Sequence, residues 1–206
     1  MTEEMIHEAS SQIRELLTDR YPLLSEEVVG RFSRYYGLVL KWNPRLHLTT
    51  LTEPHQFLAR HVDEVLFASQ FVLEGVTSIW DLGSGLGVPG IPLKILRPEL
   101  EMVLVESSRK KAIFLEIVIS EIGLVHSRVD CQRIEALSPL PAGSLLTARA
   151  VEQMERLVPQ MIHLSRNSFQ ILLFCSRSLC QSLDGAVPRL IPGSSDRYIA
   201  DLKCST

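Results

Sequence analysis

Residues 80–90 read WDLGSGLGVPG and place a carboxylate beside four glycines where an apolar run ends. Glycines at such a position let the backbone turn tightly and let a ligand approach without meeting a Cβ atom. The stretch from Gly85 to Gly90 satisfies the dinucleotide-binding pattern G-x-G-x-x-G, and Glu106 follows roughly twenty residues later. Three interpretations are open: a pyrophosphate cradle, a site for another small molecule, or a purely structural turn.

Asp81, just before the first loop glycine, separates these interpretations. A pyrophosphate roughly 4–5 Å from its carboxylate would be repelled by about 3–4 kcal/mol at an effective dielectric of about 20. A ligand with an ammonium and a sulfonium would instead be attracted, and S-adenosylmethionine carries both. Its ribose hydroxyls suit Glu106 at the end of the next strand, although NAD also has a ribose. The loop therefore favours S-adenosylmethionine, and a P-loop is excluded because no Gly-Lys-[Ser/Thr] follows.

The first third of the chain reads as three helices. Thr2 can cap the first, which Tyr21-Pro22 ends, and Ser25 can cap the second. Apolar residues at helical spacing then continue until Asn43-Pro44, where we expect the second helix to stop. A third helix is expected to start near Glu53-Pro54.

From residue 76 the hydrophobic period changes to short apolar segments that alternate with amphipathic ones. This alternation predicts an α/β fold with a doubly wound, mostly parallel sheet and helices on both faces. The expected strands are 76–82, 102–105, 126–129, 145–148 and 169–175, and the expected helices are 91–96, 112–122 and 154–164. Prolines and a glycine then interrupt the tail, which predicts a closing antiparallel hairpin. We expect one domain, 1–206, with a helical extension (1–70) on an α/β core (71–206).

The composition fits one globular domain in the cytoplasm. The chain has 206 residues, of which 46% are hydrophobic and 22% charged. The N-terminus, MTEEMIHEASSQ, has neither a basic n-region nor an apolar h-region, and the apolar runs fall short of a membrane span. Four cysteines without a C-x-x-C pair and six scattered histidines predict free thiols and no metal site. We expect a monomer.

Charge is distributed unevenly along the chain, although the net charge is only −3. Residues 1–30 hold seven acids and two bases, whereas residues 31–61 hold five bases, one acid and three histidines. A second basic cluster, Arg109-Lys110-Lys111, stands at the start of an expected helix, where cations oppose the helix dipole. Each cluster is either a solvated face or a surface that meets nucleic-acid phosphates.

Three stretches, WDLGSGLGVPGIPLKILRP, SSRKKAIFL and TARAV, together with KWNPRLHLTTLTEPHQFLARHVDEVL upstream, resemble one known family. This is the bacterial small-subunit (16S) ribosomal RNA guanine-N7 methyltransferase G family, also called glucose-inhibited division protein B. The resemblance covers roughly residues 35–175 and implies a class I (Rossmann-like) methyltransferase fold with S-adenosyl-L-methionine as cofactor. It also implies 16S ribosomal RNA of the small ribosomal subunit as partner.

The resemblance assigns roles to residues of this sequence. It places Gly83, Gly85, Gly87 and Val88 along the methionine half of the cofactor, Glu106 at the ribose, and Ile134 and Glu135 at the adenine. Arg149 would lie beside cofactor and substrate, where it positions the reactants. Together with Asp81, these residues form the expected cofactor site. The expected RNA-binding residues are Arg45, Arg60, His61, Arg109, Lys110, Lys111 and Arg177.

The chain departs from the family pattern at three places. Cys175-Ser176 stands where the family has Lys-Gly, and Arg177, which comes next, would supply the positive charge with a different geometry. His47 replaces the asparagine of the family's Asn-Leu-Thr, and Glu64 replaces an aspartate. These changes affect the expected substrate contacts more than the cofactor site.

The expected chemistry agrees with what the sequence lacks. Guanine N7 is a lone pair without a proton, so its attack on a sulfonium methyl needs alignment and exclusion of water rather than a general base. No Asn-Pro-Pro-Tyr motif follows the fourth strand, and no Pro-Cys nucleophile appears. The alternatives are a class I methyltransferase for a small molecule or protein, a non-catalytic RNA-binding module, and a dehydrogenase.

Overall fold

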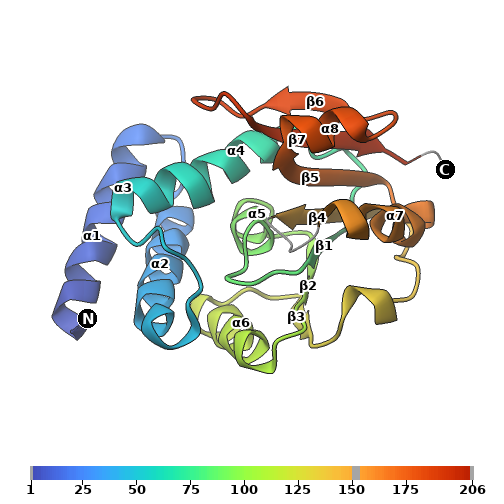
Figure 1. Ribbon diagram of the computed structural model, residues 1–206. Helices are drawn as coiled ribbons and strands as arrows, with labels where there is room; N and C mark the ends of the chain where they lie inside the picture. The colour runs from blue at the N-terminus through green and yellow to red at the C-terminus, as the bar shows by residue number, and fades with distance from the viewer. Residues whose placement is uncertain (1, 150–153, 205–206) are drawn as a thin grey trace.

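The computed structural model describes residues 2–149 and 154–204, and its helical first third lies to one side of a sheet (Figure 1). α1 (Glu3–Arg20) and α2 (Glu26–Leu46) begin as expected, because the hydroxyls of Thr2 and Ser25 accept hydrogen bonds from backbone N–H groups in the first turns. Within residues 2–149 and 154–204, no helix is both long and apolar enough to cross a membrane.

The expected stop of α2 at Asn43-Pro44 is wrong, since the helix continues to Leu46. Pro44 lacks the N–H that would bond one turn back, but it lies in the last turn, where the loss interrupts little of the helix. The left-handed residue His47 (φ 49°) ends α2 instead. The Asn43 side chain then bonds both the N–H and the carbonyl of Thr49, which fixes the chain as it leaves the helix.

The third helical segment is irregular in a way that the sequence did not indicate. It starts at the expected place as α3 (Pro54–Phe57), widens into a π-helix, η1 (Leu58–Asp63), and returns to α4 (Glu64–Ser69). A π-turn holds an extra residue and often marks a functional site. Here it carries Arg60 and leads directly into Glu64.

The seven-stranded sheet has the order β3-β2-β1-β4-β5-β7-β6. The first five strands are parallel, and β7 is antiparallel to β5 and β6, which confirms the predicted topology and closing hairpin. Strand 1 starts two residues later than expected, and strands 3 and 5 each start one residue later. The strands are β1 (Ser78–Leu82), β2 (Glu101–Val105), β3 (Ser127–Asp130), β4 (Ser144–Arg149), β5 (Gln170–Ser176), β6 (Val187–Leu190) and β7 (Arg197–Lys203).

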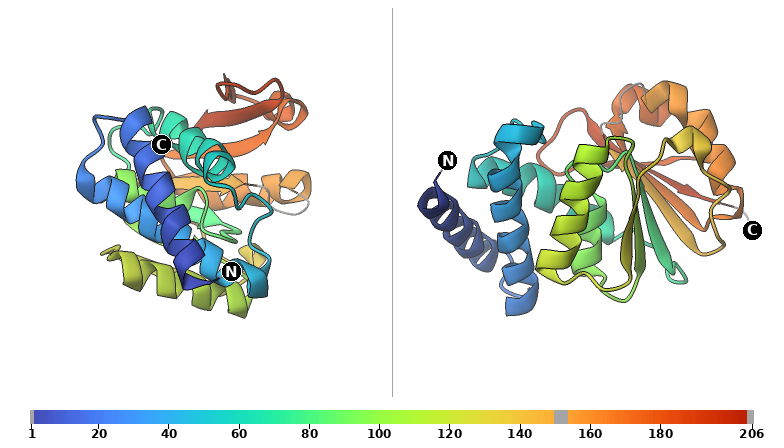
Figure 2. Two further views of the ribbon diagram at one scale, coloured as in Figure 1. Left: turned by 90° about the vertical axis from the view of Figure 1, so that its left-hand side faces the viewer. Right: turned by 90° about the horizontal axis from the view of Figure 1, so that it is seen from below.

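Helices cover both faces of the sheet, and each face has its own apolar core (Figures 1 and 2). On one face α5 (Gly90–Leu96) and α6 (Arg109–Ile122) pack together with α2. The buried aromatic residues of the helical extension, such as Phe32 and Phe57, belong to that same core. On the other face lie η2 (Ile134–Ala136), α7 (Met154–Leu164), η3 (Ser165–Asn167) and α8 (Arg177–Ser182).

Candidate active site

The loop between β1 and α5 is anchored to the neighbouring strand. The N–H groups of Gly83 and Ser84 both donate to the carbonyl of Val105 at the end of β2, at 2.8 and 3.0 Å. Gly83, Gly85 and Gly87 all have positive φ, at 70°, 57° and 100°, a region that L side chains rarely adopt. The predicted glycine turn therefore forms at the carboxyl ends of the parallel strands, where doubly wound folds bind ligands.

The glycines of this loop serve different purposes. A Cβ on Gly87 would lie 2.2 Å from Ile91 Cδ1, and one on Gly90 would lie 2.9 Å from Asp81 Oδ2, so both positions are needed for close packing of α5. Among the described residues, a Cβ on Gly85 would meet only the Gly83 carbonyl, at 3.8 Å. Gly85 therefore faces open space, as a residue that a cofactor approaches would.

Glu106 lies against this loop, as the sequence predicted. Its Oε2 accepts a hydrogen bond from Gly85 N at 2.8 Å, and its Oε1 accepts one from Ser108 N at 2.7 Å. The carboxylate thus connects the glycine loop to the residue before α6. A carboxylate at the end of the second parallel strand, beside a glycine turn, fits a ribose hydroxyl.

Asp81 is fully buried at the base of the loop. Its Oδ2 accepts a hydrogen bond from Gly90 N at 3.3 Å, whereas its Oδ1 has no partner in the described part of the chain. Burial raises the pKa of this carboxyl to about 7, and the nearby Glu106 adds to the shift, while the bond from Gly90 and the nearby Ser84 hydroxyl, which itself donates to the Asp81 backbone carbonyl, oppose it. A buried carboxyl with an unpartnered oxygen fits a cationic ligand, as expected from the sequence.

Tyr35 links the helical extension to the same loop, a contact that sequence reasoning missed. Its ring is fully buried, and its hydroxyl donates to the carbonyl of Leu86 at 2.9 Å. Burial and the charge of Asp81 hold the pKa of the Tyr35 hydroxyl well above its usual value, so it remains a donor. The only sequence signal was a tyrosine at an apolar helical position.

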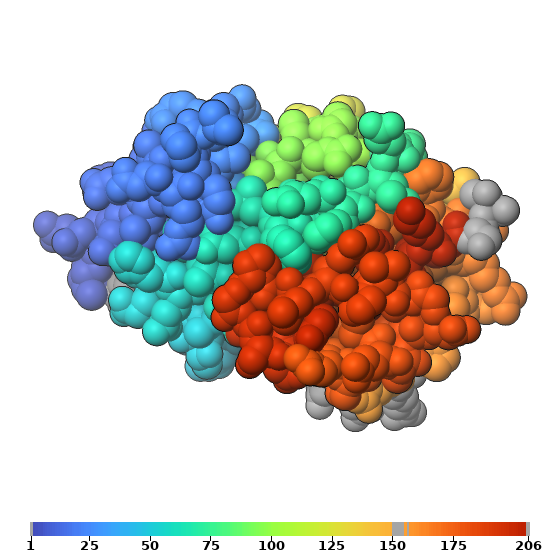
Figure 3. Space-filling view, turned by 90° about the horizontal axis from the view of Figure 1, so that it is seen from above, coloured from blue at the N-terminus to red at the C-terminus, as the bar shows by residue number. Residues whose placement is uncertain are grey.

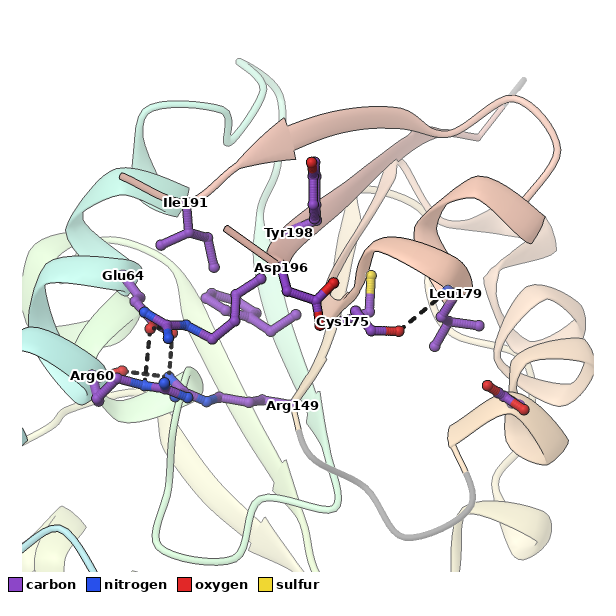
Figure 4. Close-up of a pocket in the computed structure, with 12 residues that line it drawn as sticks. Arg60, Glu64, Arg149, Cys175, Leu179, Ile191, Asp196 and Tyr198 are labelled. Carbon is purple, nitrogen blue, oxygen red and sulfur yellow. Dashed lines mark hydrogen bonds and ion pairs between the residues drawn. The ribbon is translucent and has the colours of Figure 1, made fainter. Parts of the chain in front are cut away.

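Arg149, at the end of β4, joins a buried ion cluster with Glu64 at its centre (Figure 4). Its Nη1 lies 3.2 Å from Glu64 Oε2 and also donates to the carbonyl of Arg60. Two further guanidinium groups approach the other carboxylate oxygen, with Arg60 Nε at 3.0 Å and Arg197 Nε at 2.9 Å. Sequence reasoning identified Arg60 and Arg149 but missed Glu64 and Arg197, which lie far apart in the chain.

These arginines form one wall of a pocket of about 500 Å³ (Figure 4). The pocket is lined by residues of the helical extension and of the C-terminal hairpin, which border each other on the surface (Figure 3). Cys175 and Ser176 at the end of β5, with Tyr198 on β7, also line the pocket. Arg177 was expected here but is not among the lining residues. Instead its Nη2 bonds the Ser195 carbonyl at 3.2 Å, and its guanidinium stacks on Tyr198.

His61 does not lie on an RNA-facing surface, so the expected RNA contact at this residue is wrong. It is 5% exposed, packs edge-on against Phe57 and places Nε2 3.2 Å from Thr49 Oγ1. Burial, together with the charges of Arg149 and Arg60, lowers its pKa to about 3 and keeps it neutral. Neighbours in a helix point in different directions, so a surface Arg60 did not imply a surface His61.

The other predicted residues occupy varied places. Arg45, Arg109 and Lys110 are exposed, and Lys111 is half-buried. Val88 and Ile134 are buried in the two cores, and Glu135 is exposed beside Ile134 in η2. The segment 150–153, which includes the end of the TARAV motif, lies outside the described residues.

Solved structures with the same architecture define the class of fold. The 23S rRNA methyltransferase ErmE matches with a TM-score of 0.53 and 12% identity over 69% of this chain and 67% of that one. The magnesium protoporphyrin IX methyltransferase from Synechocystis, solved with bound S-adenosylmethionine, matches with a TM-score of 0.57 and 11% identity over 88% and 98%. The fold is that of class I S-adenosylmethionine-dependent methyltransferases.

Sequence comparison defines the family. The model of the GidB family, rRNA small subunit methyltransferase G, matches residues 29–183. A relative of that name from Paracoccus denitrificans is 41% identical over 62% of this chain and 66% of its own length. Another from Nitrosomonas eutropha is 30% identical over 98% and 97%. The chain belongs to the GidB family.

Proposed function

We propose that this protein transfers a methyl group from S-adenosylmethionine to N7 of a guanine in 16S ribosomal RNA. The observation that carries the proposal is the fully buried Asp81 at the base of the glycine loop: among the described residues, its Oδ1 has no partner and Gly85 faces open space. Membership of the GidB family supports the ribosomal substrate. As an enzyme of ribosomal RNA, the protein would act in the cytoplasm, and we propose that it acts as a monomer.

The residues around the loop fit the cofactor part by part. Asp81 would hold the cationic methionine end, which the glycine turn and Val88 surround, and Glu106 would accept the ribose hydroxyls. Ile134 and Glu135, which follow β3, would meet the adenine. When bound, S-adenosylmethionine supplies an electrophilic methyl group on a positively charged sulfur.

The remaining work of the protein is to align guanine N7 with that methyl group. N7 carries no proton, so the site needs no general base, and Arg149 is suited to position the base beside the glycine loop. The pocket thiol of Cys175 has a pKa of about 12, mainly because it is desolvated, so it stays protonated at neutral pH. A protonated thiol argues against a cysteine nucleophile of the cytosine-C5 type.

Exposed cations near the mouth of the site would bind the RNA backbone. Arg109 and Lys110, with the half-buried Lys111, lie at the start of α6, directly after the segment that Glu106 organises. Cations oppose the helix dipole there, so helix stability does not explain them. We propose that they bind phosphates together with Arg45, while Arg177 acts at the outer edge of the pocket.

An assay with the purified protein tests this proposal. The protein and labelled S-adenosylmethionine are incubated in separate reactions with 16S RNA, with small subunits, with 23S RNA and with bulk protein. The RNA products are then cleaved chemically at N7-methylguanine. Label should enter one guanine of 16S RNA or the small subunit. Transfer only to 23S RNA or to protein would refute the substrate. Thermal stabilisation by NAD rather than S-adenosylmethionine would refute the cofactor.

A further inference from the structure

We propose that Glu64 is a positioning residue that holds Arg60, Arg149 and Arg197 as a phosphate-binding subsite for a nucleotide in the pocket. The inference rests on the proposed function in one respect: it takes the phosphate to be that of an RNA nucleotide. The inference is based on the fact that three arginines surround one carboxylate, that of Glu64, which is 3% exposed. The N–O distances of the three ion pairs lie between 2.9 and 3.2 Å. The three guanidinium groups come from η1, β4 and β7.

A second buried carboxylate in the same sheet shows that one arginine is enough for a structural ion pair. Asp201 on β7 is also 3% exposed, and it pairs with Arg189 Nη2 at 3.1 Å and accepts a hydrogen bond from Gln170 Nε2 at 2.7 Å, so an amide and a single arginine satisfy it. Arg189 and Arg197 are almost equally exposed, at 35% and 36%. Asp201 and Arg189 do not line the pocket, whereas Glu64 and its three arginines do. The surplus of arginines is therefore located where a ligand can reach it.

The cluster also leaves bonding capacity unused. Glu64 Oε1 lies within ion-pair distance of Arg60 Nε and Arg197 Nε, yet none of these three atoms has a partner at hydrogen-bond geometry among the described residues. Two of the three positive charges are not balanced by Glu64 itself. Among the residues that the structure describes, the other acids that line the pocket are Glu155 and Asp196, and both are exposed, so water screens their charges.

The shape and chemistry of the pocket fit a nucleotide. A volume of about 500 Å³ accommodates a small ligand, and Tyr198 is among the residues that line it. Planar guanidinium groups bind phosphate oxygens in pairs, and aromatic rings stack on unpaired RNA bases. Arg149 belongs both to this cluster and to the end of β4, beside the glycine loop. A phosphate on Arg60 and Arg197 would thus anchor the nucleotide next to the transferred methyl group.

Binding of guanosine 5′-monophosphate and of guanosine tests the subsite without any methyl transfer. Both are titrated by NMR into the full chain saturated with S-adenosylhomocysteine. The monophosphate should bind about tenfold more tightly than guanosine, the ratio expected for one charge-assisted contact. Arg197→Gln should remove most of this preference, and the matched control Arg189→Gln should retain it. Equal binding of the two ligands by the wild type, or equal losses in the two variants, would overturn the subsite.

The variant Glu64→Gln distinguishes a positioning role of Glu64 from a simple effect of its charge. Removing the carboxylate makes the pocket more positive, so a pure charge effect would strengthen monophosphate binding. A positioning role predicts weaker binding, with partial recovery in Glu64→Asp. Stronger binding in a folded Glu64→Gln variant would refute the positioning role, and the Arg197 comparison decides the subsite if that variant does not fold. A phosphate preference that depends on Arg197 without methylation of 16S RNA would uphold the subsite and refute the proposed substrate.

Discussion

Asp81→Asn should make the protein more stable at alkaline pH while it abolishes cofactor binding. The carboxyl is fully buried with one unpartnered oxygen, and its pKa is raised from 3.8 to about 7, mainly by burial. A raised carboxyl pKa means that the folded state holds the proton more tightly than the unfolded state. The free energy of unfolding therefore falls as pH rises from about 4 to 7, and the loss stays constant above pH 7.

The magnitude follows from the size of this shift. About three pH units at 1.36 kcal/mol each give a cost of about 4 kcal/mol above pH 7, of which about 2 kcal/mol arises between pH 5 and pH 7. The asparagine can keep the bond from Gly90 but buries an amide group where Oδ1 has no partner, which costs about 1–3 kcal/mol. The variant should thus be about 1–3 kcal/mol more stable than the wild type at pH 8, with no comparable gain at pH 5.

Urea unfolding of both proteins at pH 5, 6, 7 and 8 measures this difference. Subtracting the two curves removes the titration of all other groups, and the difference should grow by about 3 kcal/mol from pH 5 to pH 8. Glu116→Gln, at an exposed carboxylate on α6, is the control and should show a flat difference. S-adenosylmethionine affinity should fall at least about a hundredfold in Asp81→Asn. Parallel stability profiles, or unchanged affinity, would refute the role given to Asp81.

Three further substitutions test other parts of the site. Gly85→Leu should fold but lose S-adenosylmethionine binding, measured by calorimetry. The control Gly123→Leu, which is also at a left-handed position and has nothing within 4 Å among the described residues, should bind the cofactor normally. Equal affinities of the two variants would refute the loop assignment. Tyr35→Phe and Tyr36→Phe should each lose about 1 kcal/mol of stability in urea. Only Tyr35→Phe should also weaken cofactor binding, because Tyr36 bonds Thr52 rather than the loop, and equal binding by both variants would contradict this. Arg149→Ala should lower methyl transfer at least about a hundredfold yet remain folded, because Glu64 keeps two arginines; full activity would exclude Arg149 from positioning.

The fold was predictable from local patterns because its determinants are local. Hydroxyls at Thr2 and Ser25 cap the helices they precede, and alternating apolar segments form the sheet. The contact between Glu106 and the glycine loop was also predictable, since adjacent parallel strands bring their carboxyl ends together. Pro44 misled the prediction because a proline near a helix end removes too few bonds to terminate it.

The arginine cluster could not be predicted, because it depends on contacts between distant segments. Glu64 follows a π-turn that no sequence pattern indicated, and Arg197 comes from the closing hairpin. His61 shows the opposite failure, since proximity to Arg60 in sequence suggested a shared surface. Successive residues of a helix point roughly 100° apart, and His61 faces the core.

The most direct test of the proposed function maps N7-methylguanine in 16S RNA from cells that contain this protein, cells that lack it, and cells that carry only its Arg149→Ala variant. We predict that one guanine is methylated in the first cells and unmethylated in the other two, with the rest of the RNA unchanged. An unaltered pattern in the cells that lack the protein would contradict the proposed function.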